Sequence, residues 1–103
     1  MPGFVLTNAA LTDLESIGRY TADAWGREQR NRYLGLLDSS FHDLAANPLK
    51  GRDCPKIKAG IRKYAVGRHV VFYHRIGDGR IEVLRILHER MDVENRLSKP
   101  GAD

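Results

Sequence analysis

The stretch from residue 60 to residue 91 constrains the fold of this chain more than any other part. Two apolar runs, residues 70–73 and 81–87, follow short segments that contain glycine. Valine, isoleucine, phenylalanine and tyrosine favour strands, because branched and aromatic side chains fit a pleated, partly buried surface. Glycine suits hairpin turns, since it adopts positive φ without strain. The pattern predicts a three-stranded antiparallel meander with turns at Gly67 and at residues 77–79.

The half of the chain before the meander predicts two helices. Apolar residues recur at helical spacing from Asn8, a candidate N-cap, to Gly26, a natural stop. A second helix is predicted from about residue 27 to residue 46, where an Asn-Pro pair ends it. The connection between them is very short, so we expect an antiparallel hairpin that covers one face of the sheet. The side chains predicted to be buried against the meander are Trp25, Tyr33, Leu37 and Phe41.

Three further segments complete the predicted architecture. Residues 4–7 form a short apolar stretch that is expected to join the meander as an edge strand. Residues 49–59 show no periodic pattern and are predicted to be a loop, and residues 88–97 are predicted to form a short last helix. The expected fold is α+β with the order β-α-α-β-β-β, in a single domain of residues 1–103.

Composition excludes several classes of protein. With 42% apolar and 29% charged residues, the chain can bury one core and is not expected to be disordered. It contains neither an apolar run long enough for a membrane helix nor a recognisable secretion signal. The single cysteine, Cys54, is predicted to be exposed or half-buried and cannot form an internal disulfide. These features predict a cytoplasmic protein that makes no contact with membranes.

The net charge of +4 is unevenly distributed along the chain. Residues 1–49 hold four arginines and six acidic residues, whereas residues 50–90 hold eleven basic and four acidic residues. The sheet half is therefore basic, with a net charge of +7, and the helical half is mildly acidic, with −2. A basic surface attracts either phosphate groups or an acidic protein surface.

No pattern of residues predicts a metal or a cofactor. His69 and His74 are five apart on one predicted strand, so their side chains point to opposite faces of the sheet. No spacing of cysteine, histidine and carboxylate resembles a zinc site. The Gly-Asp-Gly segment at residues 77–79 is a turn and not a phosphate loop, because no helix follows it.

The end of the last predicted strand holds the strongest cluster of polar side chains. Alternation predicts two faces for this strand: one carries Glu82, Leu84, Ile86 and His88, and the other carries Val83, Arg85 and Leu87. An arginine in an apolar central strand needs water or a carboxylate. The candidate partners for Arg85 in the sequence are Asp92 and Asp78.

This cluster allows two interpretations. In the first, Arg85 and His88 are a satisfied polar pair at the end of the sheet. In the second, Arg62, Arg85 and His88 converge there with Lys58 as a further candidate, bind phosphate, and use His88 as acid or base.

The ordered features of the chain resemble the ParE-type toxins of the RelE/ParE toxin–antitoxin superfamily. The resemblance runs from residue 6 to residue 97, and its most specific part is the ending Ile86-Leu87-His88-x-Arg90-Met91-Asp92, in which x is any residue. The other matching residues are Ala10, Leu11, Asp13, Leu14, Ile17, Tyr20, Thr21, Trp25, Gly26, Tyr33, Leu37, Asn47, Pro48, Gly51, Arg52, Gly60, Ile61, Arg62, Gly67, His69, Val70, Phe72 and Tyr73.

The resemblance implies a bacterial stress-response toxin that inhibits DNA gyrase and is neutralised by a ParD-like antitoxin. It implies a non-enzymatic protein that binds other proteins, without sequence-specific nucleic-acid binding of its own. It also implies a set of target-binding residues, namely Arg85, His88, Arg90, Met91 and Asp92. The antitoxin is expected to contact Leu14, Ile17, Trp25, Tyr33, Leu37 and Phe41 on the helical hairpin, and to add a strand at the edge formed by residues 4–7.

Two alternatives stay open at this stage. The first is a ribosome-dependent endoribonuclease of the RelE type, with His88, Arg85 and Arg62 as catalytic residues. The second is a basic module that binds nucleic acid, whose affinity would depend strongly on salt.

Overall fold

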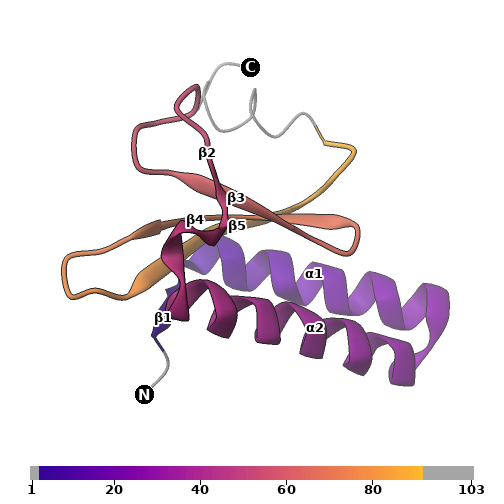
Figure 1. Cartoon of the computed structure of the whole chain (residues 1–103). Helices are drawn as coiled ribbons and strands as arrows, with labels where there is room; N and C mark the ends of the chain where they lie inside the picture. Colours follow the sequence, from indigo (N-terminus) through magenta and orange to yellow (C-terminus); the bar gives the residue numbers. More distant parts are fainter. Residues whose placement is uncertain (1–2, 92–103) are drawn as a thin grey trace.

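The structure is a computed structural model, and it describes residues 3–91. A five-stranded sheet is covered on one side by two antiparallel helices (Figure 1). The elements follow the order β1 (Phe4–Leu6), α1 (Asn8–Trp25), α2 (Arg27–Ala46), η1 (Pro48–Lys50), β2 (Arg52–Asp53), β3 (Arg62–Val66), β4 (His69–Arg75) and β5 (Ile81–His88). The predicted α+β fold, its helical hairpin and its meander are confirmed.

The helix boundaries agree with the prediction, apart from the N-cap. Thr7, and not Asn8, caps α1, because the Thr7 hydroxyl accepts a hydrogen bond from the Ala10 N–H at 3.0 Å. Asn8 is the first residue of the helix. Gly26 has a φ of 95°, which glycine adopts readily, and it turns the chain between α1 and α2. One residue is thus enough to make the hairpin antiparallel.

The strands lie in the order β1-β5-β4-β3-β2. The β3–β4–β5 meander is antiparallel, and β1 pairs in parallel with residues 81–83 of β5. The edge strand β2 lies within the predicted loop, where a two-residue strand leaves no alternation to detect. The buried Tyr73 hydroxyl holds this stretch by donating to the Pro48 carbonyl at 2.7 Å and accepting from the Gly51 N–H at 2.9 Å.

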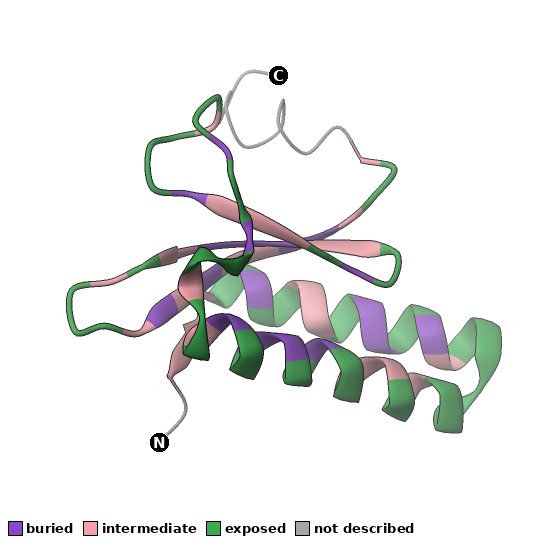
Figure 2. Ribbon diagram, viewed as in Figure 1, coloured by how far each residue is buried: buried purple, intermediate pink, exposed green. Residues whose placement is uncertain are grey.

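The main core lies between the hairpin and the sheet. Leu37 and Phe41 are buried there as predicted, with 0% and 2% exposure, and Tyr33 is half-buried. The prediction for Trp25 is wrong, because its side chain is 71% exposed. Trp25 is the last residue of α1, at the tip of the hairpin, and this tip projects past the end of the described sheet (Figures 1 and 2).

A smaller apolar cluster covers the other face of the sheet. Phe72 and Leu87 pack there with Ile61 and with Cys54, which the chain segment after β2 brings over the sheet. Cys54 is only 3% exposed, so the prediction of an exposed or half-buried cysteine is wrong. The apolar contacts made by this segment could not be read from its polar sequence.

A bulge in β5 changes the faces predicted for that strand. Phe72 pairs with Arg85, but Tyr73 pairs with Val83, so Leu84 is an extra residue in the ladder. Beyond the bulge Ile86 returns to the hairpin side together with Val83, while Leu84 packs against the cluster on the other face. Simple alternation across this strand was therefore wrong.

The expected C-terminal helix falls largely outside the described residues. Within the described part, His88 is the last residue of β5, and a turn follows in which the Met91 N–H donates to the His88 carbonyl at 3.0 Å.

Candidate functional site

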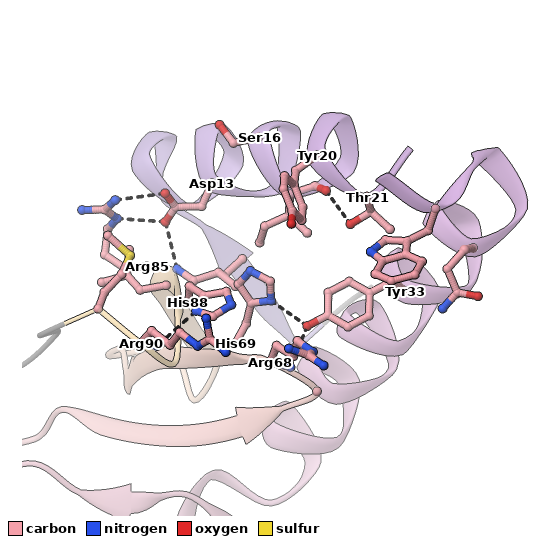
Figure 3. A pocket seen from close by; sticks show the side chains of 17 residues that line it. Asp13, Ser16, Tyr20, Thr21, Tyr33, Arg68, His69, Arg85, His88 and Arg90 are labelled. Carbon is pink, nitrogen blue, oxygen red and sulfur yellow. Dashed lines mark hydrogen bonds and ion pairs between the residues drawn. The ribbon is translucent and has the colours of Figure 1, made fainter. Parts of the chain in front are cut away.

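A groove of about 900 Å³ lies between the helical hairpin and one end of the sheet (Figure 3). One wall is formed by α1 and the first turns of α2, and the other by the β3–β4 turn and the end of β5. Its lining residues are Asp13, Ser16, Ile17, Tyr20, Thr21, Trp25, Gln29, Tyr33, Gly67, Arg68, His69, Arg85, Ile86, Leu87, His88, Arg90 and Met91.

Asp13 locks α1 to β5 at one end of this groove. Its carboxylate accepts two hydrogen bonds from the Arg85 guanidinium, both at 2.9 Å, and a third from the Ile86 N–H, also at 2.9 Å (Figure 3). The hydrogen bond to Asp13 raises the pKa of Arg85 above its ordinary value. The sequence did not reveal this pair, because the two residues are 72 positions apart.

Of the two partners predicted for Arg85, Asp78 does not fill this role in the structure. Asp78 pairs with Arg80 in the β4–β5 turn, at 2.6 Å, and Asp92 lies outside the described residues. The reason for the Asp13 contact is the short length of β1, which pairs only with residues 81–83 of β5. Beyond that point side chains bind the strand edge, since Thr7 also donates to the Leu84 carbonyl at 2.9 Å.

Two imidazole rings and a tyrosine meet at the floor of the groove. His69 and His88 are paired residues on neighbouring strands, and their ring centroids lie 5.4 Å apart. The Tyr33 hydroxyl lies 2.6 Å from His69 Nδ1 and accepts the Arg68 N–H at 3.0 Å. The Arg90 N–H donates to His88 Nδ1 at 3.1 Å. The cluster therefore joins α2, the β3–β4 turn and the exit of β5.

Burial shifts the pKa values of two members of this cluster, His69 and Tyr33. Burial, reinforced by the neighbouring His88, lowers the pKa of His69 below its ordinary value of 6.5, and burial raises the pKa of Tyr33. The Asp13 and Glu89 carboxylates favour the charged form of His69 but act more weakly than burial does. At neutral pH the floor of the groove thus holds a neutral His69 and a neutral Tyr33.

We expect the free energy of unfolding to fall as the pH is lowered through 6.5. His69 binds a proton more readily in the unfolded chain than in the folded one. The stability that neutral His69 contributes to the fold is therefore complete above pH 6.5 and is lost as the pH falls below that value. Urea unfolding at pH 7 and pH 5.5 measures this difference. The decrease should be smaller in His69→Gln than in the natural chain and unchanged in the exposed control His42→Gln. An equal decrease in all three proteins would contradict the assignment.

The predicted convergence of basic residues is correct for Arg85 and His88, which both line the groove. It is wrong for Arg62 and Lys58. Arg62 begins β3 at the opposite end of the sheet, where it donates to the Gly51 carbonyl at 2.6 Å and lies 3.7 Å from Asp53. Lys58 belongs to the segment that covers the other face.

The residues predicted to bind partners fall into two groups. Arg85, His88, Arg90 and Met91 line the groove, as do Trp25 and Tyr33, whereas Asp92 is not described. Ile17 is buried but also lines the groove. Leu37 and Phe41 belong to the core, and Leu14 is half-buried.

Sequence reasoning missed several residues of the groove, among them Asp13, Tyr20, Arg68 and His69. Tyr20 is 71% exposed on α1, and its helical spacing from the buried Ile17 places it beside the core rather than in it. Within residues 3–91 no group of three or more histidines, cysteines or carboxylates could hold a metal. No helix of that part of the chain has the length and hydropathy needed to cross a membrane.

Comparison with known proteins agrees with this architecture. The family model described as the ParE toxin of the type II toxin–antitoxin system parDE matches residues 4–93. Toxin ParE1 of Mycobacterium tuberculosis is 44% identical over 94 residues, which cover 91% of this chain and 96% of the relative. Toxin ParE of Escherichia coli is 36% identical over 99 residues, which cover 95% of each chain.

A solved structure shows the same fold. It is described as the chromosomal ParDE TA system from P. aeruginosa, and it superposes with a TM-score of 0.71 at 20% identity over 82% of this chain and 92% of that chain. The resemblance noted in the sequence is confirmed, since the family model matches nearly the whole chain. This chain belongs to the ParE family of toxins of type II toxin–antitoxin systems.

Proposed function

We propose that this toxin acts in the cytoplasm by binding DNA gyrase, without catalysis of its own, and that a ParD-like antitoxin silences it by occupying the groove. The observation that carries the proposal is the groove itself. Its walls present Tyr20 and Trp25, each 71% exposed, and its far end is the exit of β5. Large aromatic side chains left exposed beside a hollow are typical of a protein-binding site.

The antitoxin is expected to place the apolar face of a helix against Trp25 and the open side of Tyr33. A helix in a groove uses anchors on one face, and an exposed indole offers a large apolar surface to such an anchor. The edge strand β1 offers further unpaired backbone groups on its outer side, because it is the last strand of the described sheet.

The target-binding residues are proposed to be Arg85, His88, Arg90 and Met91, together with Asp92. The first four lie at the exit of β5, where the chain leaves the sheet beside the groove. An antitoxin seated in the groove would then cover the gyrase-binding residues and so neutralise the toxin.

The state of the imidazoles supports a non-enzymatic role. His88 Nδ1 accepts a hydrogen bond from a backbone N–H, so the neutral ring carries its proton on Nε2. A general base needs a free lone pair directed at its substrate, and this ring does not present one on Nε2. Arg62, which the nuclease alternative requires, lies at the other end of the sheet.

Controlled induction in cells tests the proposal directly. Gyrase-dependent supercoiling, gyrase–DNA cleavage complexes, the DNA-damage response and the rate of translation should be followed over the same time course. We expect cleavage complexes and damage signalling to rise while translation continues. Cleavage of mRNA and an immediate arrest of translation would instead identify the toxin as an endoribonuclease.

A further inference from the structure

Both imidazoles at the floor of the groove have their Nδ1 atoms engaged. The Arg90 N–H donates to His88 Nδ1, which leaves the proton of the neutral ring on Nε2. For His69 we assign the same tautomer, because the Tyr33 hydroxyl already accepts the Arg68 N–H and lies 2.6 Å from Nδ1. The other possible acceptor for the proton of the Tyr33 hydroxyl is the Val66 carbonyl oxygen, which lies farther from that hydroxyl, at 3.3 Å. Each ring therefore offers an Nε2–H donor.

These two donors have no acceptor within residues 3–91. Neither Nε2 atom forms a hydrogen bond there, and the guanidinium groups of Arg68 and Arg90, which line the same groove, form no ion pair in that part of the chain (Figure 3). Among the described residues, the one carboxylate that lines the groove is that of Asp13, and it already binds Arg85 and the Ile86 N–H. This end of the groove therefore has an excess of donors and positive charge.

The rest of the groove has a different character. The hairpin wall contributes Ile17, Tyr20 and Trp25, whereas the cations among the described lining residues, Arg68, Arg85 and Arg90, come from the β3–β4 turn and from β5 and its exit. A nucleic acid carries a charge on every nucleotide and is bound by cations spread along a channel. A groove with cations on the sheet wall and exposed aromatic side chains on the hairpin wall instead fits a peptide with one well-placed carboxylate beside an apolar anchor.

We propose that His69, His88, Arg68 and Arg90 form an oxyanion site that receives an aspartate or glutamate side chain of the antitoxin. The inference rests on the proposed function, since it assigns the chemistry of the partner at the same groove. The carboxylate accepts from the two Nε2–H groups and from the guanidinium groups, while the apolar face of the antitoxin helix covers Trp25. The antitoxin then screens two of the proposed target-binding residues, His88 and Arg90, with a charge of opposite sign.

The site can first be tested in the free toxin with acetate and inorganic phosphate as probes. Long-range ¹H–¹⁵N spectra of the histidines should show the Nε2–H tautomer for His69 and His88, and both Nε2 signals should shift saturably with the probe. His42 serves as the internal control, because it is exposed on α2 beside Asp38. Shifts that are equal for all three rings, or absent, would overturn the oxyanion site.

The second test uses the complex with the antitoxin encoded beside the toxin. Arg90→Gln should weaken the complex roughly 10- to 100-fold, the loss expected when one charged hydrogen-bond partner is removed. Arg75→Gln removes the same charge from the exposed end of β4, away from the groove, and should leave the affinity unchanged. Thermal unfolding of both variants checks that each one still folds.

The outcomes separate the two proposals. If the natural toxin binds the antitoxin tightly and Arg90→Gln binds equally well, the oxyanion site is wrong and the proposed function stands. If the natural toxin does not bind the antitoxin, the proposed function itself fails. If a single-stranded oligonucleotide shifts the His69 and His88 signals, and a short peptide that carries glutamate beside tryptophan does not, then the site binds phosphate and the carboxylate assignment is overturned.

Discussion

Replacing Asp13 by alanine should lower the free energy of unfolding by about 2–4 kcal/mol. The variant leaves the Arg85 guanidinium without its partner and removes the acceptor of the Ile86 N–H. The Asp13 side chain is only 13% exposed and that of Arg85 is 35% exposed, so solvent compensates only part of the loss. We also expect weaker toxicity, because the exit of β5 is no longer fixed against α1.

Two further variants serve as comparisons for the loss of stability expected in Asp13→Ala. Asp13→Asn retains an oxygen for the Ile86 N–H but loses the charge, and should cost about 1–2 kcal/mol. Asp38→Ala removes an exposed carboxylate that pairs with His42 on the surface of α2, and should cost less than about 0.5 kcal/mol. Denaturant unfolding measures all three variants. Equal stability of Asp13→Ala and Asp38→Ala would show that the contacts of Asp13 with Arg85 and with the Ile86 N–H contribute nothing to the stability of the fold.

Replacing Trp25 by alanine should weaken the complex with the antitoxin roughly 30- to 1000-fold, or by about 2–4 kcal/mol. The indole is 71% exposed in the toxin alone and lines the groove, so a partner that fills the groove would bury it. The same exposure predicts that the folded toxin loses less than about 0.5 kcal/mol of stability. Binding and folding should therefore respond very differently to this substitution.

A matched control distinguishes binding in the groove from non-specific binding to exposed apolar side chains. Leu49 is 63% exposed on η1 and does not line the groove, so Leu49→Ala should leave the affinity unchanged. Titration calorimetry with the purified antitoxin measures both variants. An effect of Leu49→Ala with none of Trp25→Ala would place the antitoxin on a different surface. In cells, the antitoxin should fail to protect against the Trp25→Ala toxin, provided that this variant remains toxic.

Local patterns in the sequence predicted the elements because each pattern reports on its own neighbourhood. The spacing of apolar residues defined α1 and α2, and the glycines at residues 26 and 67 marked turns that need positive φ. The resemblance to the ParE family likewise rests on the sequence alone, because it depends on an ordered set of residues along the chain. The same local patterns could not show that β5 contains a bulge, because the extra residue appears only when β4 is paired with it.

The groove depended on contacts between distant parts of the chain. Asp13 binds Arg85, 72 positions later in the chain, and Tyr33 contacts His69, 36 positions later. Separations of this size produce no recognisable spacing pattern in the sequence. The error for Trp25 has the same origin, since helical periodicity predicts which side of a helix is apolar but not how far the sheet extends beneath it. The sequence by itself thus determined the two helices, β1 and the strands of the meander, their order and the family. Only the tertiary structure decided which side chains converge at the groove, because convergence depends on strand register and on the relative lengths of packed elements.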